Sequence, residues 1–211
     1  MKKYLILFTA LIISINTYSQ EKSLLFESSE LVWCGLDFSM AKCIGSIGFT
    51  NPKAIKEEYF SKWNDLMLAE PSKFNFKKAY QKTTQITDLS VVNRRNELPD
   101  HNTLVINEPY KFEDGTIEKI ISDYDLNEVS EGLGLVYIYE ALDKTNVKAV
   151  INVVFFDIAT KKIIQATKYT SPPAGFGIRN YWAKPIYASI NASAKSYNSD
   201  FKAYKKALKK K

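Results

Sequence analysis

Three consecutive segments in the second half of the chain have the hydrophobic pattern of β-strands. Leu133–Leu142 and Val147–Phe156 are apolar at nearly every position, whereas Lys162–Tyr169 alternates more clearly between apolar and polar residues. Turn-forming residues separate the three segments, at Asp143–Asn146 and at Asp157–Lys161. Runs of this length bounded by turn signals are typical of strands, and continuous apolar runs indicate burial on both faces. The pattern predicts an antiparallel meander at the centre of the molecule.

Apolar residues at helical spacing predict helices before and after this meander. Asn51 and Pro52 suit the N-cap and the first turn of a helix whose apolar stripe continues to Leu66, until Pro71 ends it. The longest helix is predicted from about Asn180 to Ala207. Its apolar seam, which extends one residue past this predicted end, consists of Ile186, Ile190, Ala194, Tyr197, Phe201, Tyr204 and Leu208. A seam of this length must be buried against something, most simply the sheet.

The remaining segments give weaker signals. Leu31–Phe38 predicts the first strand, Ser39–Phe49 is a predicted loop, and Ser90–Arg94 and Thr103–Ile106 are candidates for short strands. No repeat or linker divides the chain. The sequence therefore predicts a single domain over residues 20–211 of the α+β (mixed α/β) class. Its sheet is expected to be rich in antiparallel strands, with helices packed on it and a long C-terminal helix.

The N-terminus has the features of a signal peptide. Lys2 and Lys3 precede the short apolar core Leu5–Ile15, and a small residue, Ser19, follows. We expect cleavage after Ser19, with export to the periplasm or the exterior; an uncleaved anchor is the alternative. The apolar core is too short to span a bilayer comfortably, and no later apolar run is long enough for a transmembrane helix. The mature chain, from Gln20 onwards, is therefore predicted to contain no transmembrane segment.

The formal net charge of +6 is concentrated at the two ends of the chain. Two lysines belong to the predicted signal peptide and six to the last ten residues, so 21 basic residues remain against 23 acidic ones between Gln20 and Phe201. A basic tail alone is weak evidence for nucleic acid or anionic lipid, and a solvated helix end is the simpler interpretation. We do not expect nucleic acid as a partner.

The cysteine and histidine content restricts the chemistry. Cys34 and Cys43 are the only cysteines; in an exported protein they can form a disulfide if the chain turns back near Met40, or Cys34 can be a small core residue. His101 is the only histidine, so a structural zinc site is not expected. The chain has no P-loop, dinucleotide fingerprint or strong nucleophile–histidine signature, and we predict neither a metal nor a cofactor.

A hydrolase without a catalytic histidine would need two carboxylates in one cleft. Asp37, Glu140 and Asp157 are the candidates, because each lies in or at the end of an apolar strand, where an unpaired charge is unfavourable. The simpler interpretation is that Asp37 and Asp157 are turn or capping residues and that Glu140 faces solvent.

The loop from Ser171 to Trp182 is the best candidate for binding. Two glycines flank an aromatic residue, and the candidate binding residues are Phe176, Arg179, Asn180, Tyr181 and Trp182. Arginine and aromatic side chains are typical of recognition surfaces. The structural alternative is a strand-to-helix crossover that turns at the glycines, with Asn180 as the helix cap and Trp182 as its anchor.

The same residues support a resemblance. Gly35–Ser39, Trp63-Asn64, Phe155-Phe156-Asp157 with Thr160, and Gly175–Trp182 resemble a family of exported proteins from Bacteroidetes-type bacteria, over most of the mature chain. The family brings no established activity with it. The Asp157…Thr160 turn between two strands is similar, at the level of fold, to envelope α/β domains of the curli-secretion lipoprotein and the Tol translocation protein. Lys161 replaces the glycine of that turn.

These features favour an exported envelope protein that is a non-catalytic binding or assembly module, with an envelope protein or a small ligand as its partner. The alternatives are a carboxylate-dependent hydrolase outside the cytoplasm and a structural subunit of a cell-surface assembly. Geometry distinguishes the first two, because carboxylates that converge in one cleft favour the enzyme.

Overall fold

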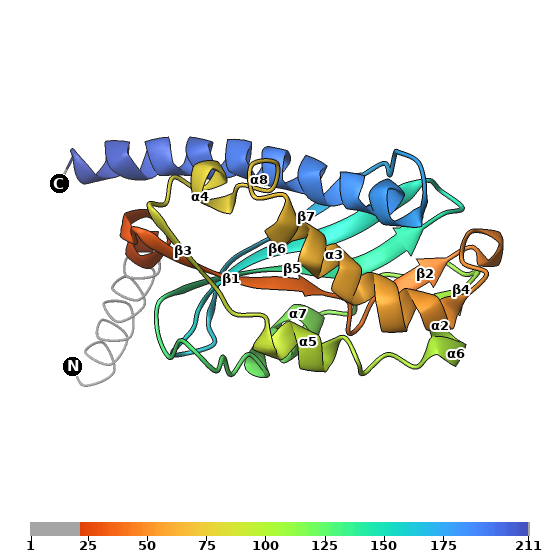
Figure 1. Ribbon diagram of the computed structural model, residues 1–211. Coiled ribbons are helices and arrows are strands. Elements are labelled where there is room, and N and C mark those ends of the chain that lie inside the picture. The colour runs from red at the N-terminus through yellow and green to blue at the C-terminus, as the bar shows by residue number, and fades with distance from the viewer. Residues whose placement is uncertain (1–21, 211) are drawn as a thin grey trace, which may run out of the picture.

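The computed structural model describes residues 22–210 and shows a seven-stranded sheet between two layers of helices (Figure 1). The predicted signal peptide and its cleavage site lie outside the described residues. The strands are β1 (Glu30–Asp37), β2 (Lys42–Ile44), β3 (Thr84–Thr87), β4 (Val105–Ile106), β5 (Leu133–Asp143), β6 (Lys148–Asp157) and β7 (Ile163–Ser171). The helices are 22–27, η1 (Ser46–Gly48), α2 (Pro52–Ala54), η2 (Ile55–Tyr59), α3 (Phe60–Ala69), α4 (Phe76–Ala79), α5 (Ser90–Arg95), α6 (His101–Leu104), α7 (Thr116–Ser122) and α8 (Ile178–Leu208).

Strand β5 is the centre of the sheet. It pairs along its whole length with β6, which is antiparallel and is followed by antiparallel β7. On its other side β5 pairs with β1 and then with β2, both parallel, and these are flanked by parallel β3 and β4. Four of the six pairings are therefore parallel. The predicted antiparallel-rich α+β fold is wrong: the sheet is mostly parallel, in an α/β-like arrangement. The predicted strand β1 joins β5 in parallel, and strands that the sequence barely signals supply the other three parallel pairs.

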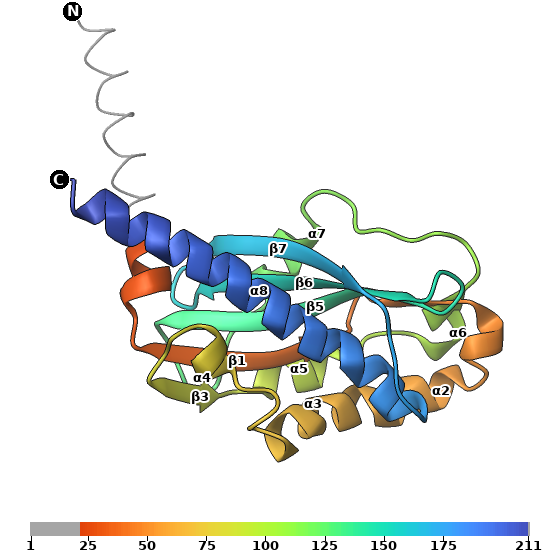
Figure 2. The same ribbon diagram turned by 90° about the horizontal axis from the view of Figure 1, so that it is seen from above.

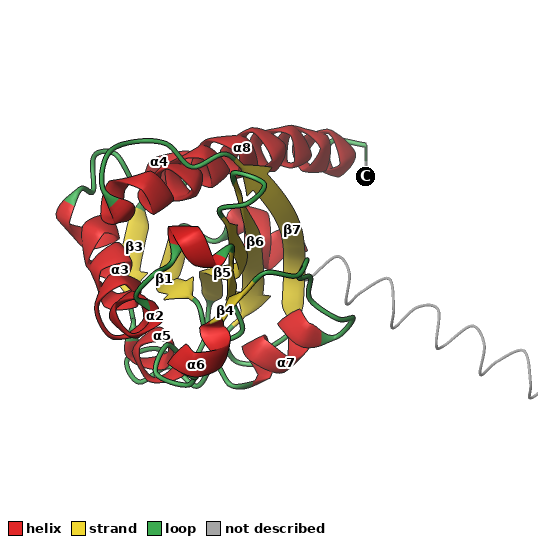
Figure 3. Ribbon diagram, turned by 90° about the vertical axis from the view of Figure 1, so that its right-hand side faces the viewer, coloured by secondary structure: helices red, strands yellow, loops and turns green. Residues whose placement is uncertain are grey.

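Helices cover both faces of the sheet, as Figure 3 shows end-on. Apolar side chains of α3 and α8 form the core on one face, which we call the upper face, and those of α5 and α7 form the core on the lower face. Every residue of β5 is buried, which confirms the prediction that both of its faces are covered. Within residues 22–210, no helix is both long and apolar enough to cross a membrane.

The end of β1 is held by two asparagine side chains instead of a neighbouring strand. Its partner β3 pairs only with the first four residues of β1, so the backbone from Leu36 to Phe38 has no strand beside it on that edge. Asn64 donates to the Leu36 carbonyl and accepts from the Leu36 amide at 3.1 and 2.8 Å. Asn96 accepts from the Phe38 amide at 2.7 Å and donates to the Leu36 carbonyl at 3.0 Å. These bonds satisfy a buried edge that would otherwise be unfavourable.

Lys82 fixes the short helix 22–27 to the body of the protein. Its ammonium group donates to the carbonyls of Leu25 and Ser28 at 2.6 and 2.8 Å, and the residue is 7% exposed. Because burial disfavours the charged form, the pKa of Lys82 is lowered from 10.5 to about 8.

This shift predicts a pH dependence of stability. Between pH 8 and 10.5 the unfolded chain holds the Lys82 proton more tightly than the folded protein, so this residue makes the free energy of unfolding rise with pH in that window. The contribution has an upper limit of about 1.4 kcal/mol per pH unit. Urea melts at pH 7.5 to 9.5 measure it, and the rise should be missing in Lys82→Met but kept in Lys78→Met, an exposed lysine. Equal pH slopes in all three proteins would contradict the prediction.

Candidate functional site

Three loops converge at the end of the molecule where β2 and β5 finish (Figures 1 and 2). They are residues 45–48 after β2, the turn between β5 and β6, and the loop that precedes α8. Two cavities, of about 230 and 410 Å³, lie among these loops and share Gly48 and Lys144 in their linings. Gly175, Gly177 and Tyr181 complete the first cavity together with neighbours on α8. Segments far apart in the sequence thus build one surface.

Glycines allow the first two loops to touch. A Cβ atom on Gly48 would lie 2.2 Å from Cγ of Lys144, and one on Gly45 would lie 2.6 Å from Oγ1 of Thr145. Gly45 also has a φ of +99°, which side-chain-bearing residues rarely adopt. The close approach positions the lysine, whose ammonium group lies 4.0 Å from the ring centroid of Tyr181. A cation–π contact therefore joins the β5–β6 turn to α8.

Buried aromatic residues support these loops from below. Trp182 is 2% exposed and stacks on Phe49 with a centroid distance of 5.4 Å, so the segment after η1 and the start of α8 share one anchor. Tyr181 contacts Trp182 edge-on at 5.2 Å. Trp63 donates its indole N–H to the carbonyl of Arg179 at 2.9 Å and fixes the first turn of α8 to α3. The loops are thus held in place by packed side chains.

The structure divides the five predicted binding residues into two groups. Phe176 is 97% exposed, and Arg179 and Asn180 are also exposed. Tyr181 is half-buried, and Trp182 belongs to the core as the structural alternative predicted. The predicted capping role of Asn180 is wrong, because α8 already begins at Ile178, after a Gly177 N-cap that needs no side chain.

Arg179 does not form the ion pair that its structural alternative predicted. The structural alternative required it to pair with a carboxylate such as Asp37 or Asp157. Asp37 instead pairs with Arg95, and Asp157 accepts from backbone amides of its own turn. Within residues 22–210, Arg179 forms no ion pair, and its guanidinium makes only a long 3.4 Å contact with Asn180.

Sequence reasoning missed Ile47, which is 95% exposed. Its segment, Gly45-Ser46-Ile47-Gly48, has the same design as Gly175-Phe176-Gly177, with a large apolar residue between glycines. That shared pattern was the signal that could have found it. We use the name loop surface for Ile47, Lys144, Phe176, Arg179 and Tyr181.

Each of the three candidate carboxylates is engaged by partners of its own. Asp37 is bound by Arg95 at 2.8 Å, and Glu140 is bound by Lys168 at 2.7 Å. Glu140 is 3% exposed, so the expectation that it faces solvent is wrong. Asp157 pairs in register with Leu133, seven residues before Glu140 along β5. At the rise of a β-strand this separates the two carboxylates by about 23 Å.

The candidate disulfide is absent from this structure. Cys34 and Cys43 are both free and buried. They belong to different clusters, Cys34 to the core of the lower face and Cys43 to that of the upper face, so the sheet lies between them. Burial raises the pKa of both thiols, which keeps them protonated. Both act as small core residues.

A further cleft, of about 630 Å³, lies between η2, α3 and α5 and was not foreseen. Glu57 of η2, Asp65 of α3 and Glu97 of the turn after α5 contribute carboxylates, and η2 is a π-helical turn of the kind often found near functional sites. Within residues 22–210, no group of three or more potential metal ligands occurs. The lining of this cleft is mainly polar and charged, and one of its residues, Asn96, is already bound to the end of β1. The loop surface therefore remains the stronger candidate for a binding site.

The comparisons with known proteins leave this assignment to the geometry. The chain matches no family model, no curated protein and no solved structure.

Proposed function

We propose that this protein is an exported, non-catalytic binding module that docks an envelope protein through the loop surface. The observation that carries the proposal is the exposure of Ile47 and Phe176, at 95% and 97%, on loops that Phe49 and Trp182 hold from below. Large apolar side chains on anchored loops add nothing to the core. They are typical of interaction sites, where a few aromatic or apolar residues supply most of the binding energy.

The charges of the loop surface define the chemistry of its partner. Lys144 and Arg179 are the cations of the loop surface, and within residues 22–210 neither pairs with a carboxylate. We propose a protein partner with an apolar pocket for Phe176 and acidic residues around that pocket. Opposite charge at the rim accelerates association and selects the orientation, while the buried aromatic side chain provides affinity.

The arrangement of the carboxylates supports binding over hydrolysis. Asp37 and Glu140 each have a basic partner, and Asp157 lies about 23 Å along the strand from Glu140. A carboxylate-dependent hydrolase needs both groups within reach of the same substrate bond. The proposal of export rests on the charged start, the short apolar core and the small residue at Ser19.

The test is capture of envelope proteins with purified variants as bait. Ile47→Ser/Phe176→Ser should lose at least ten-fold of the specific capture and keep the wild-type melting curve, because both side chains are almost fully exposed. The matched control is Leu98→Ser/Leu208→Ser, which removes two exposed apolar side chains elsewhere and should capture as the wild type does. Proteins lost with the first variant and retained with the control identify the partner by mass spectrometry.

Charge reversal provides the second part of the test. Lys144→Glu/Arg179→Glu should weaken capture and reverse its response to salt, whereas Arg94→Glu/Lys119→Glu, on the lower helices, changes net charge equally and should have little effect. Capture that is unchanged by the Ile47/Phe176 double variant would refute the loop surface as the docking site.

A further inference from the structure

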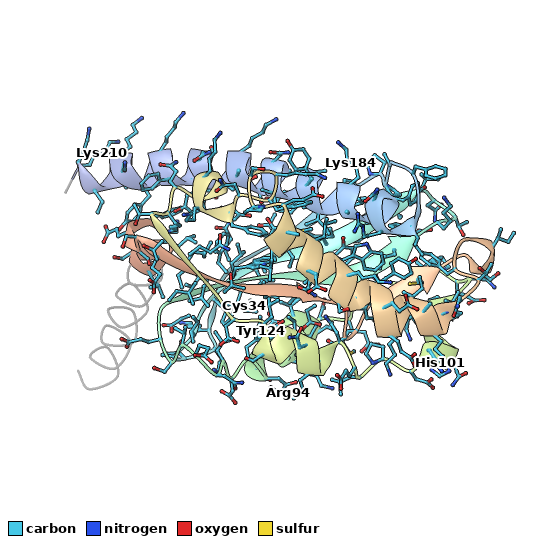
Figure 4. The ribbon with its side chains drawn as sticks, in the orientation of Figure 1. Cys34, Arg94, His101, Tyr124, Lys184 and Lys210 are labelled. Carbon is cyan, nitrogen blue, oxygen red and sulfur yellow. The ribbon has the colours of Figure 1, made fainter. Side chains whose placement is uncertain are left out.

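The outer side of α8, continued by the turn after it, carries a row of exposed lysines. We call Lys184, Lys195, Lys202, Lys205, Lys206, Lys209 and Lys210 the basic face; all seven are exposed. At 3.6 residues per turn they occupy about 140° of the helix circumference. Figure 4 shows Lys184 and Lys210 projecting from the same side of α8, away from the sheet. From first to last the row extends over about 39 Å.

The solvated helix end that the sequence predicts is part of a longer exposed face, which extends back to Lys184. The helix α8 is continuous to Leu208, and its opposite side is buried through Trp182, Ile186 and Tyr197. Its sequence contains one acidic residue, Asp200, which accepts from Gln165 of β7 and so faces the sheet. Within residues 22–210, no ion pair engages the basic face; its aromatic contacts are those of Lys184 with Tyr187 and of Lys205 with Phe201, both within α8. Seven positive charges thus share one side of a rigid helix without neutralisation.

We infer that the basic face docks the protein onto an anionic phospholipid bilayer. A straight, convex row of single-sign charge complements an extended, flat surface of opposite charge, whereas a small anion needs donors that converge in a cavity. All seven residues are lysines, whose ammonium groups act as point charges. Arginines would instead indicate bidentate hydrogen bonding to individual phosphate groups. Among the five lysines from Lys202 to Lys210, neighbours three or four residues apart lie about 5–6 Å from each other, which is shorter than the Debye length of about 8 Å, so these five act together.

The same geometry specifies how the protein binds. The apolar seam of α8 is already used against the sheet, so the helix cannot insert into the acyl region as an amphipathic anchor does. Attachment is electrostatic, reversible and sensitive to salt. With α8 lying along the bilayer, the loop surface at its N-terminal end stays at the edge of the contact, where it can reach a second protein. This inference does not depend on the identity of that partner.

Vesicle co-sedimentation of the processed chain tests the inference. We expect binding to vesicles of phosphatidylcholine with 30% phosphatidylglycerol at about 50 mM salt, no binding to pure phosphatidylcholine, and release at about 500 mM salt. Lys202→Gln/Lys206→Gln/Lys209→Gln should lower the bound fraction at least ten-fold. Arg94→Gln/Lys111→Gln/Lys119→Gln removes the same charge away from α8 and should bind as the wild type does.

Three results would overturn the inference. They are absence of binding to the anionic vesicles, equal losses in the two triple variants, and α8-dependent binding to heparin or duplex DNA without binding to vesicles. The last result would assign the basic face to a polyanion instead of a bilayer. We expect the Ile47→Ser/Phe176→Ser variant to bind anionic vesicles as the wild type does. The vesicle experiment therefore tests the basic face independently of the loop surface.

Discussion

Replacing Arg95 by methionine is expected to lower the free energy of unfolding by about 3–5 kcal/mol, because it leaves the Asp37 carboxylate buried without its cation. Arg95 donates to Asp37 at 2.8 Å and to the Ser39 hydroxyl at 2.8 Å, and it also pairs with Asp123. Asp37 is fully buried and accepts further bonds from the Tyr124 hydroxyl and the Ser39 amide, both at 2.8 Å. Burial, together with the adjacent carboxylate, raises the pKa of Tyr124, so its hydroxyl stays a donor.

The matched control is the double variant Asp37→Asn/Arg95→Met. The asparagine keeps one acceptor oxygen, for the Ser39 amide, and places an NH2 group opposite Tyr124, whose hydroxyl can accept from it. The substitution removes the buried negative charge. We expect the double variant to be more stable than Arg95→Met alone, since an uncompensated charge costs more than the loss of the pair. Urea melts of the three proteins measure the difference. A double variant that is less stable than Arg95→Met would show that the unpaired charge of Asp37 is not the main cause of the lost stability.

Gly35→Ala is the second substitution with a large expected effect, a loss of about 2–5 kcal/mol. The glycine has a φ of +97° at the bulge of β1, and an added Cβ would lie 2.6 Å from Cγ2 of Val92 and 2.8 Å from Oδ1 of Asn64. The conformation alone costs an alanine about 1–2 kcal/mol. Crowding of a packed site adds about 1–3 kcal/mol, and displacing Asn64 releases the edge of β1 that it holds.

Gly115→Ala separates these two contributions. Gly115 has a similar φ, +82°, but an added Cβ would meet nothing within 4 Å. We therefore expect Gly115→Ala to lose only the conformational part, about 1–2 kcal/mol. Equal losses for the two alanine variants in urea melts would show that Gly35 is not tightly packed against α3 and α5.

The parts of the fold that could be predicted are long segments with a sustained pattern. The apolar runs that became β5 and β6 and the seam of α8 each bury many residues against a continuous surface, and this burial produces the periodicity. The parallel pairing could not be predicted in this way. Strands β2, β3 and β4 have three, four and two residues, too few to show a period, and each forms only because β1, β5 or its neighbour is already in place.

Short apolar runs led to a wrong secondary-structure prediction for a related reason. Ser90–Arg94 was a candidate strand but forms most of α5, where Val91 and Val92 pack on the lower face of the sheet. Two adjacent apolar residues do not distinguish a strand from one turn of helix. The ion pair between Asp37 and Arg95 was also invisible, because 58 residues separate its members and only the fold brings them together.

The candidate site was predicted in part. The glycine-flanked loop before α8 was recognised from its composition, but Ile47 and Lys144 join it through contacts between loops that the sequence does not specify. The sequence also could not separate Trp182 from Phe176. Both are large aromatic residues near glycines, yet one is 2% and the other 97% exposed, because α8 turns one toward the core while the loop holds the other outside.

The most direct test of the loop surface is a photo-cross-linking measurement in the producing cell. The photoreactive residue p-benzoylphenylalanine replaces Phe176 in one protein and Leu208 in another. Both positions are exposed, and the length of α8 separates them by about 45 Å. We predict that irradiation joins the position-176 protein to one discrete envelope protein, that Lys144→Glu/Arg179→Glu reduces this adduct, and that position 208 does not form it. The same protein adduct from both positions, or no protein adduct from position 176, would contradict the proposed docking site.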